Sequence, residues 1–316
     1  MYAYPVSDRG DVVLSNLSET DIRLLRVFAK VVESKGFSAA QITLNVNQST
    51  ISTHMQALEQ RLGIRLCERG RSGFALTERG QMIYQASQKL FVAIEDFRSE
   101  AGVARNCLVG TLTVGIIDCL IGNPACVLSD VIRKFNDHAP EVQVNIRVTG
   151  PSEIERLVLD GHCDVGLGAC GRHSPYLAYD DLFEERQTLF CGKLHPLFAD
   201  AANVSLADLK DNKLIRRAYA APEHLPADAW IGSAATADLM ESVALLVLSG
   251  RYIGFLPYHY AAPWVQSGDM RALLDSEVSY DNPIYLVLRK VEIQKPVVRA
   301  FTDELLKTQA ALRVAA

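Results

Sequence analysis

Residues 44–63 read LNVNQSTISTHMQALEQRLG, in which a tight turn leads into an amphipathic helix. The turn is Asn45-Val46-Asn47, and Gly63 is a typical residue for the C-terminal end of the helix. The apolar residues between them recur three or four positions apart, as on the buried face of a helix: Ile51, Met55, Leu58 and Leu62. This stretch therefore predicts a turn and a helix with one buried face and one exposed face.

Two further helices are expected before this turn. Ser18 is a typical N-cap, and the run that follows it has apolar residues at helical spacing until Gly36 ends it. Phe37, Ala40 and Leu44 mark a second, shorter helix. Residues 1–17 show no periodicity, so we expect a loose N-terminal arm there.

A hairpin and a long helix are expected after Gly63. Glycines separate two short apolar edges in residues 64–76, which favours a two-stranded hairpin. Residues 78–106 then form a helical pattern without proline, about 40 Å long. Its apolar positions form a seam typical of a coiled coil: Ile83, Ala86, Leu90, Ala93 and Phe97. A core helix of a bundle has the same periodicity, but the position between two differently patterned regions favours a dimerising linker.

The second half of the chain changes to strands alternating with helices. Alternation with a period of two or short apolar runs predict strands over residues 112–116, 142–148, 164–168 and 252–256. Helical spacing lies between them over residues 127–135, 152–159 and 238–248. This order predicts an α/β domain over residues 108–316, with parallel strands joined by crossover helices.

The outward face of the helix after Asn47 carries almost no charge. Its exposed positions are short hydroxyl or amide side chains: Gln48, Ser49, Thr50, Ser52, Thr53 and Gln56. A merely solvated face carries more Lys and Glu, whereas Gln, Ser and Thr can hydrogen-bond base edges in the major groove. Arginines that can hold phosphates follow: Arg61, Arg65, Arg69 and Arg71. The order of these features favours sequence-specific DNA binding over the solvated alternative.

Five blocks of sequence carry a family pattern. They are LLRVF (24–28), GFSAA (36–40), LNVNQSTIS (44–52), LEQRLGIRL (58–66) and LTERG (76–80). In order and spacing they resemble the DNA-binding end of the LysR-type transcriptional regulators, densely over about residues 20–105. The resemblance is weaker beyond, where GTL (110–112), CDVGL (163–167), HPL (195–197) and GFLP (254–257) fit the family's effector domain.

The resemblance implies an architecture and partners. Expected are a winged helix-turn-helix (18–77), a dimerising linker helix (78–106) and a two-lobed α/β effector-binding domain (108–316). The last is shaped like a type 2 periplasmic binding protein, with one lobe over about 108–184 and 283–316 and the other over about 185–282. Such proteins usually assemble as tetramers, and a small-molecule effector adjusts their binding to double-stranded promoter DNA. No cofactor is expected.

Some site residues follow from the same resemblance. The family's DNA-contacting positions fall on Gln48, Ser49, Thr50 and Arg69. Thr53 stands where the family often has Arg or Lys, which removes one expected contact. Cys67 stands where the family usually has Phe, which alters the packing under the wing.

Ligands of a two-lobed α/β domain bind at the carboxyl ends of its strands. The turns expected there contain Asp118, Cys119, Thr149, Gly150, Pro151, Ser152, Gly168 and Thr236, and Arg216 ends a strand that could supply a cation. A small polar turn that points backbone N–H groups at a cleft suits a carboxylate, so we expect a small organic anion as effector. Asp118 near the cleft leaves open a ligand with a donor group.

Composition limits the other classes of protein. The 316 residues contain no run of 18 apolar residues, which argues against a membrane span. The first twenty residues lack the pattern of a secretion signal, so we expect a cytoplasmic protein. Seven cysteines without a C-x-x-C are expected to be reduced thiols. The net charge of −5 argues against nucleic-acid binding over the whole surface.

Two alternatives remain open at this point. A regulator that senses oxidants could form a disulfide between Cys119 and Cys126, or between Cys163 and Cys170. An enzyme or a free-standing binding protein is more distant, because no catalytic motif is found and the seven histidines are scattered. No metal site is expected, since strand alternation would separate Cys163 from Asp164.

Overall fold

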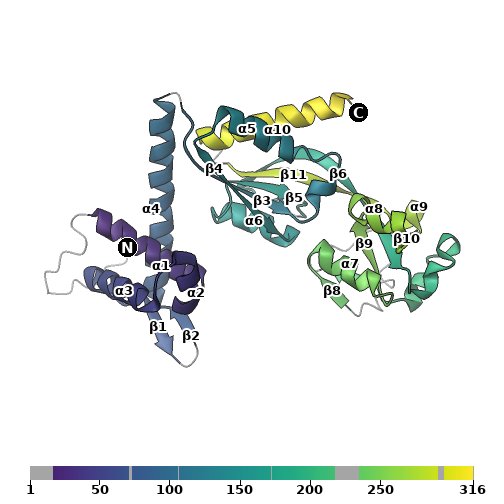
Figure 1. Ribbon diagram of the computed structural model, residues 1–316, viewed down its shortest axis with the longest axis horizontal. Coiled ribbons are helices and arrows are strands. Elements are labelled where there is room, and N and C mark those ends of the chain that lie inside the picture. The colour runs from purple at the N-terminus through teal and green to yellow at the C-terminus, as the bar shows by residue number, and fades with distance from the viewer. Residues whose placement is uncertain are drawn as a thin grey trace. The chain divides into compact units, whose positions relative to one another are not determined.

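The computed structural model describes residues 17–70, 73–105, 107–171, 173–217, 235–290 and 295–315. The chain divides into two compact units, Met1–Phe97 and Arg98–Ala316 (Figure 1). The arm expected over residues 1–17 lies, except for its last residue, outside the described residues. Within the described parts, no helix has the length and apolar character needed to cross a membrane.

The described part of the first unit consists of helices and one hairpin. Its elements are α1 (Glu19–Glu33), α2 (Phe37–Leu44), α3 (Gln48–Leu62), β1 (Cys67–Gly70), β2 (Gly73–Leu76) and α4 (Glu78–Val103), which ends in the second unit. Strands β1 and β2 pair antiparallel. Gly63 ends α3 in the left-handed region, at φ 66°, where a residue without Cβ meets no steric penalty. The helices and the hairpin expected from the sequence are therefore confirmed.

The core of the first unit lies where the three short helices meet. It contains the buried face of α3 together with Leu24, Leu25, Phe28, Val31, Phe37 and Leu66. The first helix is held by a capping box: the Ser18 hydroxyl accepts from Asp21 N, and the Asp21 carboxylate accepts from Ser18 N. The cap at Ser18 and the buried apolar residues thus both favour α1 where the structure has it.

The second unit is an α/β structure around one large sheet. Its strands are β3 (Gly110–Ile117), β4 (Val142–Thr149), β5 (Val165–Gly168), β6 (Leu177–Gly192), β7 (Ile215–Arg217), β8 (Ala235–Ala237), β9 (Ile253–Pro257), β10 (Met270–Leu273) and β11 (Tyr280–Arg289). Its helices are α5 (Leu128–His138), α6 (Pro151–Leu159), α7 (Met240–Leu248), α8 (Tyr258–Ser267), α9 (Asp275–Val278) and α10 (Pro296–Ala315). Each helix and strand expected over residues 112–256 is present, with ends shifted by a few residues.

The large sheet contains both parallel and antiparallel pairs of strands. The order of the sheet is β10-β6-β11-β5-β3-β4, and β9 also pairs with β6. Strand β3 is parallel to β4 and β5, but β11 is antiparallel to both β5 and β6. The predicted parallel arrangement is therefore confirmed for β3, β4 and β5, whereas the long strands β6 and β11, which the sequence did not predict, add antiparallel pairs.

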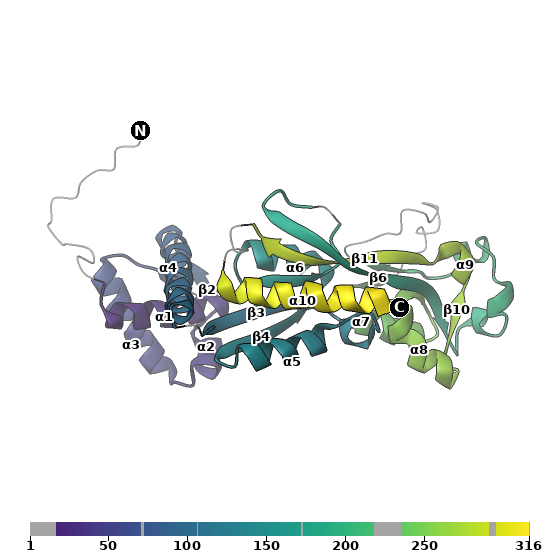
Figure 2. The same cartoon turned by 90° about the horizontal axis from the view of Figure 1, so that it is seen from above.

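Strand β6 joins two separate groups of core residues. Its Leu177 and Leu182 belong to the core that contains α5, α6 and α10, whereas Leu189 and Phe190 belong to the cores around β9, β10 and α7. Figure 2 shows α5 and α10 side by side along one face of the sheet. Helix α6 packs against β3, β5 and β11. The unit thus has two lobes, and β6 passes from one to the other.

Candidate nucleic-acid interface and effector cavity

The start of α3 presents an uncharged polar surface. Its exposed side chains are Gln48, Ser49, Thr53 and Gln56, while Thr50 and Ser52 are half-buried. On the opposite side of the helix, Ile51 and Met55 are 0% and 1% exposed and belong to the core. The core therefore fixes which face of α3 is turned outward. The Thr53 hydroxyl donates to the carbonyl oxygen of Ser49 at 3.0 Å, so its proton is already used within the helix.

Arg61 lies at the end of α3 but does not project as a free cation. Its guanidinium donates from two nitrogens to the carboxylate of Asp21 on α1, one of them at 2.9 Å. Asp21 is fully buried, and the hydrogen bonds from Arg61 and then Ser18 hold the pKa of its carboxyl well below the ordinary range. A buried carboxylate needs such a partner, and the phosphate contact expected of Arg61 stays a prediction beside this ion pair. The ion pair ties α3 to α1.

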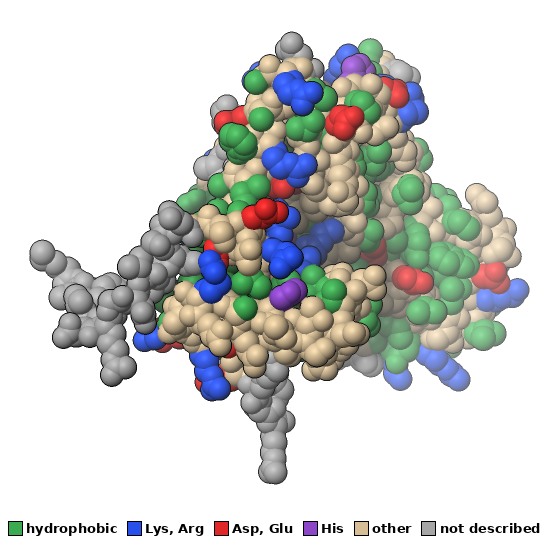
Figure 3. Space-filling model, turned by 60° about the vertical axis from the view of Figure 1, so that its left-hand side comes forward, with side chains coloured by type: hydrophobic (Ala, Val, Ile, Leu, Met, Phe, Trp, Pro, Cys, Tyr) green, Lys and Arg blue, Asp and Glu red, His purple; other side chains and the backbone are tan. Residues whose placement is uncertain are grey.

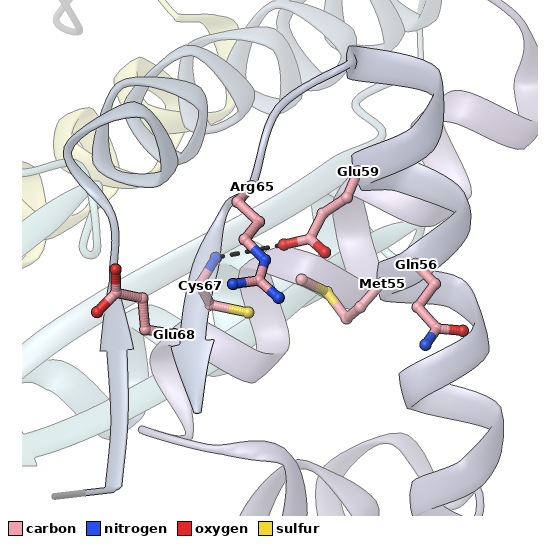
Figure 4. Close-up of a pocket in the computed structure, with 6 residues that line it drawn as sticks. All are labelled: Met55, Gln56, Glu59, Arg65, Cys67 and Glu68. Atoms are coloured by element: carbon pink, nitrogen blue, oxygen red, sulfur yellow. Dashed lines mark hydrogen bonds between the residues drawn. The ribbon is translucent and has the colours of Figure 1, made fainter. Parts of the chain in front are cut away.

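A hollow of about 470 Å³ separates α3 from the hairpin (Figure 4). Its lining is Met55, Gln56, Glu59, Arg65, Cys67 and Glu68. Glu59 accepts from Leu66 N at 2.8 Å and from Cys67 N at 3.4 Å, which ties α3 to the start of β1. Arg65 is exposed at this junction. Arg65, two residues before β1, thus lines this hollow together with Gln56 of α3.

The other two predicted arginines cannot be placed in the same way. The side chain of Arg69 and the whole of Arg71 lie outside the described residues. The face of the molecule drawn in Figure 3 carries Lys and Arg side chains interspersed with Asp and Glu side chains and with uncharged surface.

The predicted seam of α4 has two kinds of residue. Ile83 and Leu90 are half-buried and pack against the core of the first unit. Ala86, Ala93 and Phe97 are exposed, and Phe97 is 71% exposed. The bundle-core interpretation therefore applies to part of the seam, and the exposed remainder is available to another chain.

A cavity of about 600 Å³ lies between segments of the two lobes. It is lined by Val148, Thr149, Gly150, Ser152, Glu153, Thr236, Ala237, Asp238, Leu239 and Ser242. The structure thus brings together four of the predicted effector residues, from the end of β4, the start of α6 and β8. The approach is close, because a Cβ added to Gly150 would lie 4.0 Å from the carbonyl oxygen of Asp238.

Asp118 and Cys119 lie beside this cavity rather than in its lining. The Asp118 carboxylate accepts a hydrogen bond from Met240 N at 2.5 Å, so it occupies the N-terminus of α7 in the other lobe. Cys119 has a φ of 66°, and its carbonyl oxygen lies 3.0 Å from Nε2 of His259 on α8. The loop after β3 is therefore fastened to the second lobe at two points.

The remaining predicted effector residues also fall outside the lining. Pro151 and Gly168 are buried, and a Cβ at Gly168 would lie 2.7 Å from a methyl group of Ile117. Gly168 thus serves close packing between β5 and β3. Arg216 is exposed on β7, where its register partner is Thr236.

The sequence analysis missed several lining residues: Glu153, Asp238, Leu239 and Ser242. Glu153 lies in the first turn of α6, and Asp238 lies two residues before α7. Their position after the carboxyl ends of β4 and β8 was the available signal.

Burial disfavours the thiolate form of the four cysteines on which the redox alternative depends. All seven are free thiols, and burial raises the pKa of Cys119 and Cys170 to about 12 and raises those of Cys126 and Cys163 as well. Because the thiolate is the reactive form, a raised pKa disfavours the redox alternative. Within the described residues, no group of three or more His, Cys, Asp or Glu side chains is arranged to hold a metal.

Comparison with known families identifies the class. A family model described as "Bacterial regulatory helix-turn-helix protein, lysR family" matches residues 22–81, and one described as "LysR substrate binding domain" matches residues 106–310. The chain belongs to the LysR-type transcriptional regulators. It is a DNA-binding regulator with a domain for a small-molecule effector.

Individual proteins are similar over nearly the whole chain. The transcriptional activator BauR of Pseudomonas aeruginosa is 40% identical over 295 residues, covering 92% of this chain and 96% of BauR. The AphB N100E variant, from a Vibrio cholerae virulence activator, has a TM-score of 0.63 at 17% identity, covering 90% of this chain and 97% of that chain. Full-length CbnR complexed with its target DNA has a TM-score of 0.58 at 22% identity, covering 91% and 99%. At 17% and 22% identity, these two structures show that the fold is shared.

Proposed function

We propose that the start of α3 reads operator DNA through the major groove. Gln48, Ser49 and Thr50 are assigned to base edges, with Thr53 offering its methyl group to a thymine. The observation that carries this assignment is the absence of Lys, Arg, Asp and Glu from residue 48 to residue 56 of the sequence, on a helix whose opposite face is buried. The hydroxyl and amide groups of such a surface can donate to and accept from base edges.

We assign the phosphate contacts to arginines of the hairpin region. Arg65 is the described member, and Arg69 and Arg71 are proposed with it from their positions in the sequence. Phosphate contacts hold a protein on any duplex, whereas base contacts distinguish one sequence from another. Arg61 is left out of this set because Asp21 binds its guanidinium.

Two variants separate these roles. Operator fragments are first recovered by genome-wide selection with the purified protein. Gln48→Ala is then expected to weaken operator binding by about 1–3 kcal/mol and to leave binding to random DNA unchanged. Arg65→Ala is expected to weaken both and to make the logarithmic salt slope shallower by about 1. Equal losses on operator and random DNA for Gln48→Ala would contradict the assignment.

We propose that α4 is the dimerising helix and that dimers associate into tetramers. The exposed apolar side chain of Phe97 supports this, because a large exposed apolar residue on a long helix favours a partner. Phe97→Asp is expected to lower the oligomeric state in sedimentation without unfolding the chain. Met82→Asp, at a second exposed apolar position of α4 outside the predicted seam, is the matched control, and an unchanged oligomer for Phe97→Asp would reject the interface.

We propose that the cavity beside α6 and α7 binds the effector. Thr149, Gly150 and Ser152 from one lobe and Thr236 from the other line it, so a ligand there contacts both lobes. A ligand that binds two lobes at once can shift their arrangement, and through it the binding of DNA. The 40% identity with BauR, which is named an activator, supports activation as the outcome, and the cytoplasm, where promoter DNA is found, as the place.

A further inference from the structure

Two charged side chains in the last turn of α3 are bound by neighbouring elements. Arg61 donates from Nε and Nη2 to the carboxylate of Asp21 on α1. Glu59 accepts from the backbone N–H groups of Leu66 and Cys67 where β1 begins (Figure 4). Residues two apart on an α-helix differ in direction by about 200°, so these two side chains leave α3 on nearly opposite sides. The C-terminal end of α3 is therefore held by polar contacts on both sides.

The contact between Arg61 and Asp21 is fixed at both ends. Asp21 is fully buried, and its carboxylate also accepts from Ser18 N at 2.8 Å, so it is already oriented by α1. A planar guanidinium that donates from two nitrogens to one carboxylate fixes orientation as well as distance. The side chain of Arg61 is nevertheless 43% exposed, so a shorter side chain there leaves room for water rather than an empty cavity.

The proposed base-reading residues lie at the other end of the same helix. Apolar packing beneath Ile51 and Met55 decides which face of α3 is turned outward, but such packing is not directional. The contacts of Glu59 and Arg61 are directional and allow one orientation of the helix. Gln48 lies about 17 Å from Glu59 along the helix axis, so a tilt of about 10° at this end moves Gln48 by about 3 Å, the length of a hydrogen bond.

We infer that Glu59 and Arg61 are positioning residues for operator recognition. They hold α3 so that the side chains at its start meet the base edges, and they act without touching the DNA. The inference rests on the proposed role of α3 in reading the operator. A positioning residue changes the discrimination between operator and random DNA, whereas a phosphate contact changes binding to both and the salt dependence. A residue that only stabilises the fold lowers the folded fraction and weakens both equally.

The test on Arg61 uses the full chain with an operator fragment and random DNA of the same length. The ratio of the two dissociation constants measures discrimination. Arg61→Ala is expected to lower this ratio about tenfold, as for one lost base contact, and to leave the logarithmic salt slope unchanged. Arg61→Lys keeps a cation for Asp21 but lacks the planar fork, and is expected to lower the ratio about threefold. If Arg61→Ala does not fold, Arg61→Lys decides the outcome.

The test on Glu59 uses a variant pair that differs in one acceptor group. Glu59→Ala removes the acceptor for the two N–H groups and is expected to lower the ratio about tenfold. Glu59→Gln keeps an acceptor oxygen and is expected to recover most of the ratio. Arg23→Ala, on the exposed surface of α1, is the control and is expected to change the ratio less than about twofold. Urea unfolding gives the folded fraction of each variant, and binding is compared where these fractions are equal.

Three outcomes would overturn the inference. They are an unchanged ratio for Arg61→Lys, an unchanged ratio for Glu59→Ala, or equal losses on operator and random DNA. Equal losses together with a shallower salt slope for Arg61→Ala would assign Arg61 to a phosphate instead. Gln48→Ala tests the proposed function separately. If Gln48→Ala lowers the ratio and the Glu59 and Arg61 variants do not, α3 reads DNA without these positioning residues. If Gln48→Ala leaves the ratio unchanged, the proposed function itself fails.

Discussion

The candidate DNA surface takes its base-reading residues from one stretch of chain, residues 48–53, whereas the effector cavity takes its lining from two distant segments, residues 148–153 and 236–242. In the first case a single helix presents the side chains, and the core beneath it only has to fix the outward face. In the second case both lobes must fold and approach before any site exists. The first site therefore depends on the stability of a small core, and the second depends on the contacts between the two lobes.

The largest loss of stability is expected from a substitution in the small core of the first unit. Phe28 is fully buried and packs edge-on against Tyr84, and Phe28→Ala is expected to cost about 3–5 kcal/mol. Because typical domains are stable by only about 5–15 kcal/mol, operator binding should be lost. Calorimetry should show a lower transition for the first unit and an unchanged one for the second.

The matched variant for this comparison lies in the second unit. Phe301 is also fully buried and packs edge-on against Phe135. Phe301→Ala should lower the transition of the second unit and leave that of the first. If both variants shift the same transitions together, the two units do not unfold separately and the comparison fails.

A medium effect is expected where the lobes are fastened together. Asp118→Asn removes the charge from the hydrogen bond to Met240 N, at an expected cost of about 1–3 kcal/mol. Urea unfolding of the second unit should report the loss, and the first unit should be unaffected. Asp130→Asn, on the exposed surface of α5, is the control and should stay within about 0.5 kcal/mol. Equal effects of the two variants would mean that Asp118 does not fasten the lobes.

The smallest effect is expected at the first helix. Ser18→Ala removes the N-cap of α1, at a cost of about 1 kcal/mol near neutral pH. The same change removes one of the bonds that hold the pKa of Asp21 below its ordinary value of 3.8. A carboxyl with a lowered pKa gives stability that is present above the ordinary pKa and is lost as the pH falls through the folded-state pKa.

The difference between wild type and Ser18→Ala should therefore shrink as the pH falls below about 3.8. Chemical unfolding of the first unit, followed over this pH range, measures it. A difference that is constant with pH would show that the cap acts without the Asp21 charge.

The sequence predicted the first unit closely and the second only in part. The spacing of apolar residues, Ser18 and Gly63 indicated the helices, since caps and periodicity act within one or two turns. The ion pair of Arg61 with Asp21 was not predicted, because Asp21 lies forty residues away on another helix. The cavity was found at Thr149 and Thr236 through the rule on strand ends, but Asp238 was overlooked.

What the sequence determined by itself is the set of helices and strands, the uncharged start of α3 and the family pattern. These depend on neighbours a few residues apart, where periodicity and helix-end preferences act. The tertiary structure alone decided that Arg61 binds Asp21, that β11 runs antiparallel to β5, and that Asp118 occupies the start of α7. Each of these depends on packing between segments far apart in the chain, and local preferences carry no information about which distant groups will meet.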